Sequence, residues 1–234
     1  MINLNDVPTI DWNNFEQASE LTKKVVKDLA ADKVTLRKLV YAIEDNPDLL
    51  RQCERHQLLD RLVIYDGGDR NFKIRLNFTT NDHFDRPHDH RFSFTSLILR
   101  GCYRHIWYKY DDEIYDHTLD DQAKQWLDRY HPDDVSSINI PEMKPMFITE
   151  ELQNACYTMH HNVIHATITT PDSLSLFLKG SGEKSRSIIA DRATNKLWWR
   201  YGEADETDER RNQKLMPIEV YRELRGKLET WGII

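Results

Sequence analysis

The first part of the chain places its apolar residues with the period of an α-helix. Between residues 12 and 31 they recur at steps of three and four, at Phe15, Ala18, Leu21, Val25 and Leu29. This spacing puts one apolar stripe on one side of a helix. A second helix is expected over residues 35–44. Asn46 and Pro47 suit a helix cap and the first helical position, and they predict a third helix that runs to about Leu59.

From Leu62 onward the pattern changes to that of β-strands. Residues 62–65 and 72–78 are two strand-like runs on either side of an Asp-Gly-Gly-Asp turn at residues 66–69, which predicts a hairpin. Further strand-like runs cover residues 92–99, 103–110, 136–140, 146–148, 155–159, 163–169, 174–178 and 185–189. Many short strands at near-regular spacing predict a sandwich or a barrel.

These patterns divide the chain into three parts. We expect a helical N-terminal extension (1–61), a β-barrel (62–200), and a charged loop with a C-terminal helix (201–234). An acidic insertion at residues 111–134 interrupts the barrel and would lie over one barrel end, either as a lid or as an inert excursion. Residues 203–211 are expected to form a solvated loop, and Pro217 opens the last helix. The predicted fold class is mainly β with flanking helices.

Composition narrows the classes of protein. The 39% hydrophobic residues include no apolar run near the roughly 20 residues of a membrane span, so no membrane partner is expected. A formal net charge of −7 disfavours nucleic acid as a partner. The three cysteines are scattered, which argues against a disulfide framework, and no secretory signal opens the sequence. We therefore expect a cytoplasmic protein.

Histidines carry the candidate chemistry. His88 and His90 are two residues apart, so an extended chain directs both imidazoles to the same face. A second cluster, at residues 160–165, supplies His160, His161 and His165. Imidazole suits iron, zinc, copper and nickel, and a pair needs only one or two further ligands to close a site. The sequence therefore predicts a metal site built from His88, His90 and a distal histidine.

The surroundings of these histidines resemble the two motifs of the cupin superfamily, G-x5-H-x-H-x(3,4)-E-x6-G and G-x5-P-x-G-x2-H-x3-N. His88 and His90 match the histidine pair, Gly101 the closing glycine, and His165 the histidine of the second motif. The departures are Asp82 for the opening glycine, Phe94 for the glutamate, His160 for the proline, Asn162 for the turn glycine and Thr169 for the asparagine. The resemblance covers residues 62–190. It implies a cupin jelly-roll β-barrel whose metal site lacks the carboxylate ligand.

Either His165 or His161 can be the distal ligand, because both would face the same way on a continuous strand. We favour His165. Asn162 supplies a turn before it, since asparagine tolerates the left-handed conformation, and residues 170–173 form a turn after it. His161 would then orient a ligand or substrate.

The missing carboxylate makes the chain similar to three-histidine thiol-dioxygenase-like cupins, in which iron(II) keeps positions open for a substrate and for dioxygen. The resemblance implies a mononuclear non-haem iron(II) oxygenase acting on a small anionic molecule, because neutral imidazoles leave the +2 charge of the ion in place. Zinc, nickel, copper and manganese are alternative metals. Cupins commonly dimerise through barrel surfaces, so a homodimer is expected.

Strand alternation supplies candidates for the wall of a binding site, although the pattern does not fix which strand face points inward. We expect Arg75, Phe94, Tyr103 and Trp107 to contact substrate, and His105, Tyr157 and His161 to take part in catalysis. Arg75 would pair with a substrate carboxylate, and His105 or Tyr157 would exchange a proton. A surface or cross-strand role is the alternative for each.

Two other functions stay open at this stage. His83 and Asp85 form an H-x-D pair which, with a distal histidine, resembles the facial triad of 2-oxoglutarate-dependent oxygenases. The chain could also be a non-catalytic cupin that binds a small ligand or a protein partner. A hydrolytic triad is set aside, because no Ser or Cys lies in a nucleophile motif such as G-x-S-x-G.

Overall fold

A computed structural model describes residues 1–56, 59–79, 83–109, 144–191, 196–201 and 207–234. The helices are η1 Leu4–Asp6, α1 Phe15–Ala31, α2 Lys33–Ala42, α3 Pro47–Leu50, η2 Gly68–Arg70, α5 Asp208–Lys214 and α6 Ile218–Thr230. The strands are β1 Glu54–Arg55, β2 Leu59–Asp66, β3 Phe72–Thr79, β4 His83–Phe84, β5 Phe94–Arg100, β6 Tyr103–Lys109, β7 Lys144–Glu151, β8 Cys156–Met159, β9 His165–Thr169, β10 Leu174–Gly180, β11 Arg186–Asp191 and β12 Lys196–Tyr201. The acidic insertion and the strand predicted at 136–140 lie outside the described residues.

The N-terminal helices begin where side-chain caps stop the chain from unwinding. Asn14 caps α1 and Asp32 caps α2, each accepting a hydrogen bond from a backbone N–H in the first turn. The third helix also begins as predicted, because Asn46 accepts from two backbone N–H groups. Its predicted length is wrong, however, since the helix ends at Leu50.

The chain leaves α3 early because Cys53 is drawn into the core. Cys53 is fully buried, and its sulfur accepts a hydrogen bond from the backbone N–H of Val63 in β2. The next residues form β1, which pairs with β2 through Glu54 and Arg61. Two further expectations need correction. The loop expected at residues 203–211 overlaps helix α5, which spans Asp208–Lys214. Strand β12 was not predicted.

Eight strands of the described residues, β3 to β10, form a jelly roll. They pair from the outside inward, β3 with β10, β4 with β9, β5 with β8 and β6 with β7, like one long hairpin. Pairing of β10 with β5 and of β9 with β6 then gathers them into the orders β3-β10-β5-β8 and β4-β9-β6-β7. A long hairpin wound into two facing antiparallel sheets is the jelly-roll arrangement.

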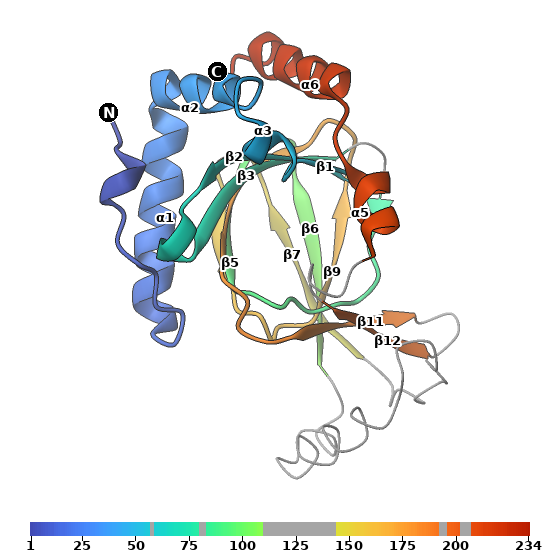
Figure 1. The fold of residues 1–234 in the computed structure, drawn as a ribbon. Coiled ribbons are helices and arrows are strands. Elements are labelled where there is room, and N and C mark those ends of the chain that lie inside the picture. Colours follow the sequence, from blue (N-terminus) through green and yellow to red (C-terminus); the bar gives the residue numbers. More distant parts are fainter. Residues whose placement is uncertain (57–58, 80–82, 110–143, 192–195, 202–206) are drawn as a thin grey trace.

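The sheets formed by the described residues are antiparallel and do not close into a hydrogen-bonded barrel, which corrects the β-barrel that was expected. In the described residues the larger sheet runs β1-β2-β3-β10-β5-β8, a four-stranded sheet runs β4-β9-β6-β7, and β11 pairs with β12 in a two-stranded sheet. Figure 1 shows helices α1, α2 and α6 on the outer side of the larger sheet. None of the described helices is long and apolar enough to cross a membrane.

The main hydrophobic core lies between the larger sheet and the helices. Ile74, Leu76 and Phe78 of β3 belong to it, together with Val26 and Leu224 of α1 and α6. The intervening residues of β3 point to the opposite side of the sheet, toward β6 and β9. The apolar face of β3 therefore packs against the helices, and its more polar face lines the space between the sheets.

Candidate metal centre

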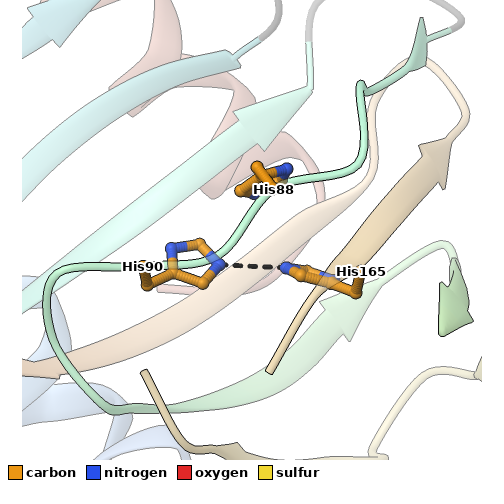
Figure 2. Close-up of side chains that lie close together, drawn as sticks. All are labelled: His88, His90 and His165. Atoms are coloured by element: carbon orange, nitrogen blue, oxygen red, sulfur yellow. Dashed lines mark hydrogen bonds between the residues drawn. The ribbon is translucent and has the colours of Figure 1, made fainter. Parts of the chain in front are cut away.

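Three histidines from two distant segments meet between the sheets. His88 and His90 lie in the segment between β4 and β5, and His165 is the first residue of β9. The backbones of His88 and His165 exchange two hydrogen bonds, at 2.8 and 2.9 Å, which fix one segment against the other. Figure 2 shows the imidazoles of all three residues gathered at one point. The structure brings His88, His90 and His165 together, as predicted.

The ring nitrogens are arranged as a ligand set. Nδ1 of His88 lies 2.7 Å from the carbonyl oxygen of Arg86, so it donates there and leaves Nε2 to accept a metal. Nε2 of His90 is 2.9 Å from Nε2 of His165 (Figure 2). Two nitrogen ligands at about 2.1 Å from one ion, and at about a right angle, are about 3 Å apart. One nitrogen of each residue lies within 4.8 Å of the others, so the set can hold a metal ion.

The environment favours the neutral form of two of these imidazoles, His90 and His165, and metal ligands must be neutral. Burial lowers the pKa of His165 well below its usual value, and the charges of neighbouring histidines lower it further. Burial also lowers the pKa of His90, with smaller contributions from the positive charges of His88, Arg75 and Lys184. Of these neighbours, Arg75 supplies a positive charge that favours an anionic ligand.

An ion pair with a buried carboxylate supports the residue between the two ligands. Asp89 is 5% exposed, and one carboxylate oxygen accepts a hydrogen bond from the backbone N–H of Ile188 at 2.7 Å. The other oxygen is 2.5 Å from Nζ of Lys184. Sequence reasoning missed this pair. The only hint was an aspartate inside the H-x-H pattern, because Lys184 lies far along the chain.

The structure separates the two distal candidates. His165 joins His88 and His90, whereas Nδ1 of His161 is 2.8 Å from a carboxylate oxygen of Glu183 and 3.3 Å from the hydroxyl of Ser93. His161 forms a second group with His160 and Glu183 whose donors lie within 4.8 Å of one another. The left-handed turn expected at Asn162, before His165, is wrong, because Asn162 does not have a positive φ.

The aromatic candidates surround the histidines. Phe94, in the place of the cupin glutamate, is 2% exposed and meets His90 edge-to-face with ring centroids 4.8 Å apart. Phe94 also stacks on Phe177, with ring centroids 4.4 Å apart. Trp107 lies 6.0 Å from His165 between ring centroids and donates its indole N–H to Thr149. Sequence reasoning missed Phe177, which alternation along β10 places on the same face as Ser175.

The polar candidates also face the space between the sheets. The guanidinium of Arg75 lies 4.3 Å from the ring centroid of Phe177. Tyr103 donates to the hydroxyl of Ser175 at 3.3 Å, and burial raises the pKa of Tyr103 to about 12. Burial also raises the pKa of Tyr157, whose ring centroid is 4.9 Å from that of His105.

His105 stands directly behind His165. Its Nδ1 is 3.0 Å from Nδ1 of His165, and burial lowers its pKa to about 4, with a smaller contribution from the charge of His88. Asp85, from the alternative H-x-D pair, lies 3.3 Å from Nδ1 of His88, on the side of that ring away from the ligand nitrogen. Asp85 is therefore placed to orient His88, and the side chain of His83 lies outside the described residues.

No protein-family model matches this sequence, and no curated protein matches it. Solved structures similar to the chain include KdgF from Halomonas sp., at 10% identity and a TM-score of 0.33, covering 54% of this chain and 85% of that one. An RmlC-like cupin from Shewanella frigidimarina has 9% identity and a TM-score of 0.35, covering 56% and 85%. Hydroquinone 1,2-dioxygenase from Sphingomonas sp. TTNP3, with 4-hydroxybenzoate bound, has 12% identity and a TM-score of 0.34, covering 52% and 65%.

The fold is assigned from the order of the strands. Eight strands paired from the outside inward form two facing sheets, and the histidine pair and distal histidine of the cupin motifs meet between them. Gly101, at the closing-glycine position, turns the chain from β5 to β6 with φ of +75°. The described strands therefore form a jelly-roll fold.

Proposed function

We propose that this protein is a metal-dependent cupin enzyme, a mononuclear non-haem iron(II) oxygenase acting on a small anionic molecule. The observation that carries the proposal is the convergence of three imidazoles, with Nε2 of His90 and Nε2 of His165 only 2.9 Å apart. His88, His90 and His165 would hold the ion. Three ligands leave further coordination positions for substrate and dioxygen, and bound iron(II) would supply the redox chemistry that side chains lack.

The charge of the centre supports an anionic substrate. Three neutral imidazoles leave the charge of a divalent ion uncompensated, and no Asp or Glu joins His88, His90 and His165 in the group found among the described residues. Arg75 faces the space between the sheets from β3 and adds a further positive charge. A carboxylate, phenolate or thiolate would gain from both charges.

The surrounding side chains divide the remaining tasks. Phe94 and Phe177 form an apolar wall against His90 and exclude water from that side. Arg75 orients the anionic group of the substrate, and Tyr157 offers a phenol that stays protonated at neutral pH because burial raises its pKa. Trp107 and Tyr103 complete the wall on the facing sheet. The homodimer and the cytoplasmic location stay predictions.

Anaerobic purification followed by elemental analysis tests the metal assignment. We expect about one equivalent of iron in the wild-type protein and a loss of about ten- to a hundredfold or more in metal affinity for His88→Ala, His90→Ala and His165→Ala. His161→Ala is the matched control, because its ring binds Glu183 instead, and it should keep its metal. Equal metal content in wild type and His90→Ala would contradict the proposed centre.

A second measurement tests the reaction class. Iron(II)-loaded and zinc-loaded protein are compared for oxygen uptake with a panel of small carboxylates, phenols and thiols, with and without 2-oxoglutarate. Uptake is expected only with iron, without 2-oxoglutarate, and only for anions. Arg75→Gln should raise the KM for the accepted anion about tenfold or more. A requirement for 2-oxoglutarate would favour the other oxygenase class, and a metal-free protein that still binds a small ligand would favour a non-catalytic cupin.

A further inference from the structure

One lysine joins the two segments that carry the candidate metal ligands. Lys184 lies in the connection between β10 and β11, and its ammonium group donates to Oδ2 of Asp89 at 2.5 Å and to Oδ1 of Asn162 at 3.2 Å. Asp89 stands between two of the candidate ligands, and Asn162 lies three residues before the third. A third part of the chain therefore bridges both ligand-bearing segments.

The carboxylate of Asp89 and the ligand rings lie on different sides of their segment. The rings of His88 and His90 lie together, with centroids 4.8 Å apart. The carboxylate contacts Ile188 of β11 and Lys184 instead. This is the alternation expected of an extended chain, so a rotation that moves the carboxylate also moves the two imidazoles.

Both carboxylate oxygens of Asp89 have a donor. Oδ1 accepts from the backbone N–H of Ile188 at 2.7 Å, and Oδ2 accepts from the ammonium group of Lys184. The residue is only 5% exposed, and a buried acceptor that loses its donor costs free energy. Without the ammonium group, turning Asp89 toward water would supply a new donor. That rotation would disturb the histidines on either side.

We propose that Lys184 is a positioning residue for the metal centre: by holding Asp89 and Asn162, it keeps the histidine pair and the distal histidine at the separation that binds an ion. This inference rests on the proposed metal site and extends it to a residue from a third segment. Lys184 itself takes no part in coordination, because an ammonium group has no lone pair to offer.

The preceding residue makes a bridge that serves as the matched control. Glu183 accepts from the backbone N–H of Ser93 and lies 2.8 Å from Nδ1 of His161. The same two segments are also joined there without Glu183. The backbone N–H of His161 donates to the hydroxyl of Ser93 at 3.1 Å, and the backbone N–H of His90 donates to the carbonyl oxygen of His161 at 3.0 Å. Changing Glu183 therefore leaves these contacts in place.

Zn²⁺ affinity, measured by competition with a chromophoric chelator, is the first test. Lys184→Met keeps an unbranched side chain without a donor, and we expect it to weaken Zn²⁺ binding about tenfold, as for other residues that support metal ligands. Lys184→Arg keeps the cation and should recover most of the affinity. The visible spectrum of the Co²⁺-loaded protein, which reports the ligand geometry, should change in Lys184→Met and return in Lys184→Arg.

The sign of the effect distinguishes positioning from charge. Loss of a positive charge near the centre would by itself favour a cation. Unchanged or tighter Zn²⁺ binding by Lys184→Met would therefore overturn the proposal. Glu183→Gln should change Zn²⁺ affinity less than about threefold. A tenfold loss in Glu183→Gln would also overturn it, because any change in this connection would then act alike.

A double-mutant cycle tests whether Lys184 acts through Asp89. In an Asp89→Asn background there is no carboxylate for the ammonium group to hold. Lys184→Met should then weaken Zn²⁺ binding less than about threefold further. A full tenfold loss in both backgrounds would overturn the positioning route.

The outcomes also separate this inference from the proposed function. A wild-type protein that binds neither Zn²⁺ nor Co²⁺ overturns both. Zn²⁺ binding that depends on His90 but is unchanged in Lys184→Met overturns only the inference. Urea denaturation of each metal-free variant shows whether it is folded. If Lys184→Met does not fold, Lys184→Gln, which has a shorter side chain without charge, replaces it and should show the same loss of affinity.

Discussion

Neighbouring residues of β3 face different surroundings. Ile74 and Leu76 are fully buried under the helices, whereas Arg75 faces the second sheet and packs on Phe177. The sequence shows the alternation but not its direction. An inward-pointing polar face is unusual for a sheet that covers a core, because polar groups there need partners or a ligand. The direction becomes readable only when the helices are seen to cover the apolar face.

Gly101 lies at a turn that has no room for a side chain. Its φ is +75°, and an added Cβ would lie 2.2 Å from the hydroxyl oxygen of Ser173. We expect Gly101→Ala to lower the free energy of unfolding by about 2–4 kcal/mol, because backbone strain and a clash add. Urea denaturation measures this.

Gly226 gives the matched control for that substitution. It lies inside α6 with no atom within 4 Å of an added Cβ. Gly226→Ala should therefore raise stability by about 0.5–1 kcal/mol, because alanine loses less entropy in a helix. Equal effects of the two substitutions would show that the turn at residue 101 tolerates a side chain.

The histidine pair His88 and His90 was the part of the candidate site that the sequence predicted best. His88 and His90 followed from their spacing alone, because an extended segment sends alternate side chains to one face. The choice between His161 and His165 required the structure, since it depends on where β9 begins. The carboxylate of Glu183, which lies in a loop after β10, contacts His161, and no local sequence pattern connects the two residues. Long-range contacts of this kind leave no trace in one sequence.

Among the elements, the strands were predicted better than the ends of the helices. The hairpin around residues 66–69 and the strand of Cys156–Met159 follow from alternation and turn residues. The predicted third helix is too long, because a local apolar pattern cannot show that the sulfur of Cys53 accepts a hydrogen bond from the backbone N–H of Val63. Element β1, with two residues, is too short for periodicity to reveal; it is held by its pairing with β2 and by a bridge between Glu54 and Leu215.

Strand β1 supports a prediction about pH. Burial raises the pKa of Glu54, but hydrogen bonds and charge from His56 and Arg61 outweigh it and hold that pKa well below its ordinary value of 4.5. A carboxylate with a depressed folded pKa stabilises the fold above its unfolded pKa and loses this contribution as pH falls. Glu54→Gln should therefore cost about 1 kcal/mol at pH 7, and the difference should shrink below about pH 4.5.

Denaturation of both proteins between pH 3 and pH 8 measures the effect. Glu150→Gln is the control, because Glu150 pairs with Arg104 on an exposed surface, and it should change stability by less than about 0.5 kcal/mol. A pH-independent difference between wild type and Glu54→Gln would mean that the carboxylate charge does not contribute.

At the scale of the whole molecule, one hydrophobic core joins segments from both ends of the chain. Val26 of α1, Leu176 of β10 and Leu224 of α6 belong to the same cluster. Tyr221 of α6 is fully buried and donates to the carbonyl oxygen of Val40 in α2. The outer helices and the larger sheet therefore depend on each other, while the candidate metal centre lies on the opposite face of that sheet.

The metal ligands join two further segments across the molecule. His90 comes from the connection between β4 and β5 and His165 from the start of β9, and their hydrogen bond spans 75 positions in the sequence. An ion that binds only the folded arrangement should stabilise the whole fold, by about 2.7 kcal/mol at a hundred times its dissociation constant. For a chain of this size that corresponds to a rise of about 5–10 °C in Tm.

Calorimetry with and without Zn²⁺ measures this rise, and two variants locate its origin. His90→Ala should abolish the increase, because two imidazoles bind the ion much less tightly than three. His160→Ala should keep it, since His160 belongs to the separate group with His161 and Glu183. Each variant is compared with itself, so any destabilisation by the substitution cancels. If His160→Ala lost the increase and His90→Ala kept it, the second group would be the stabilising metal site.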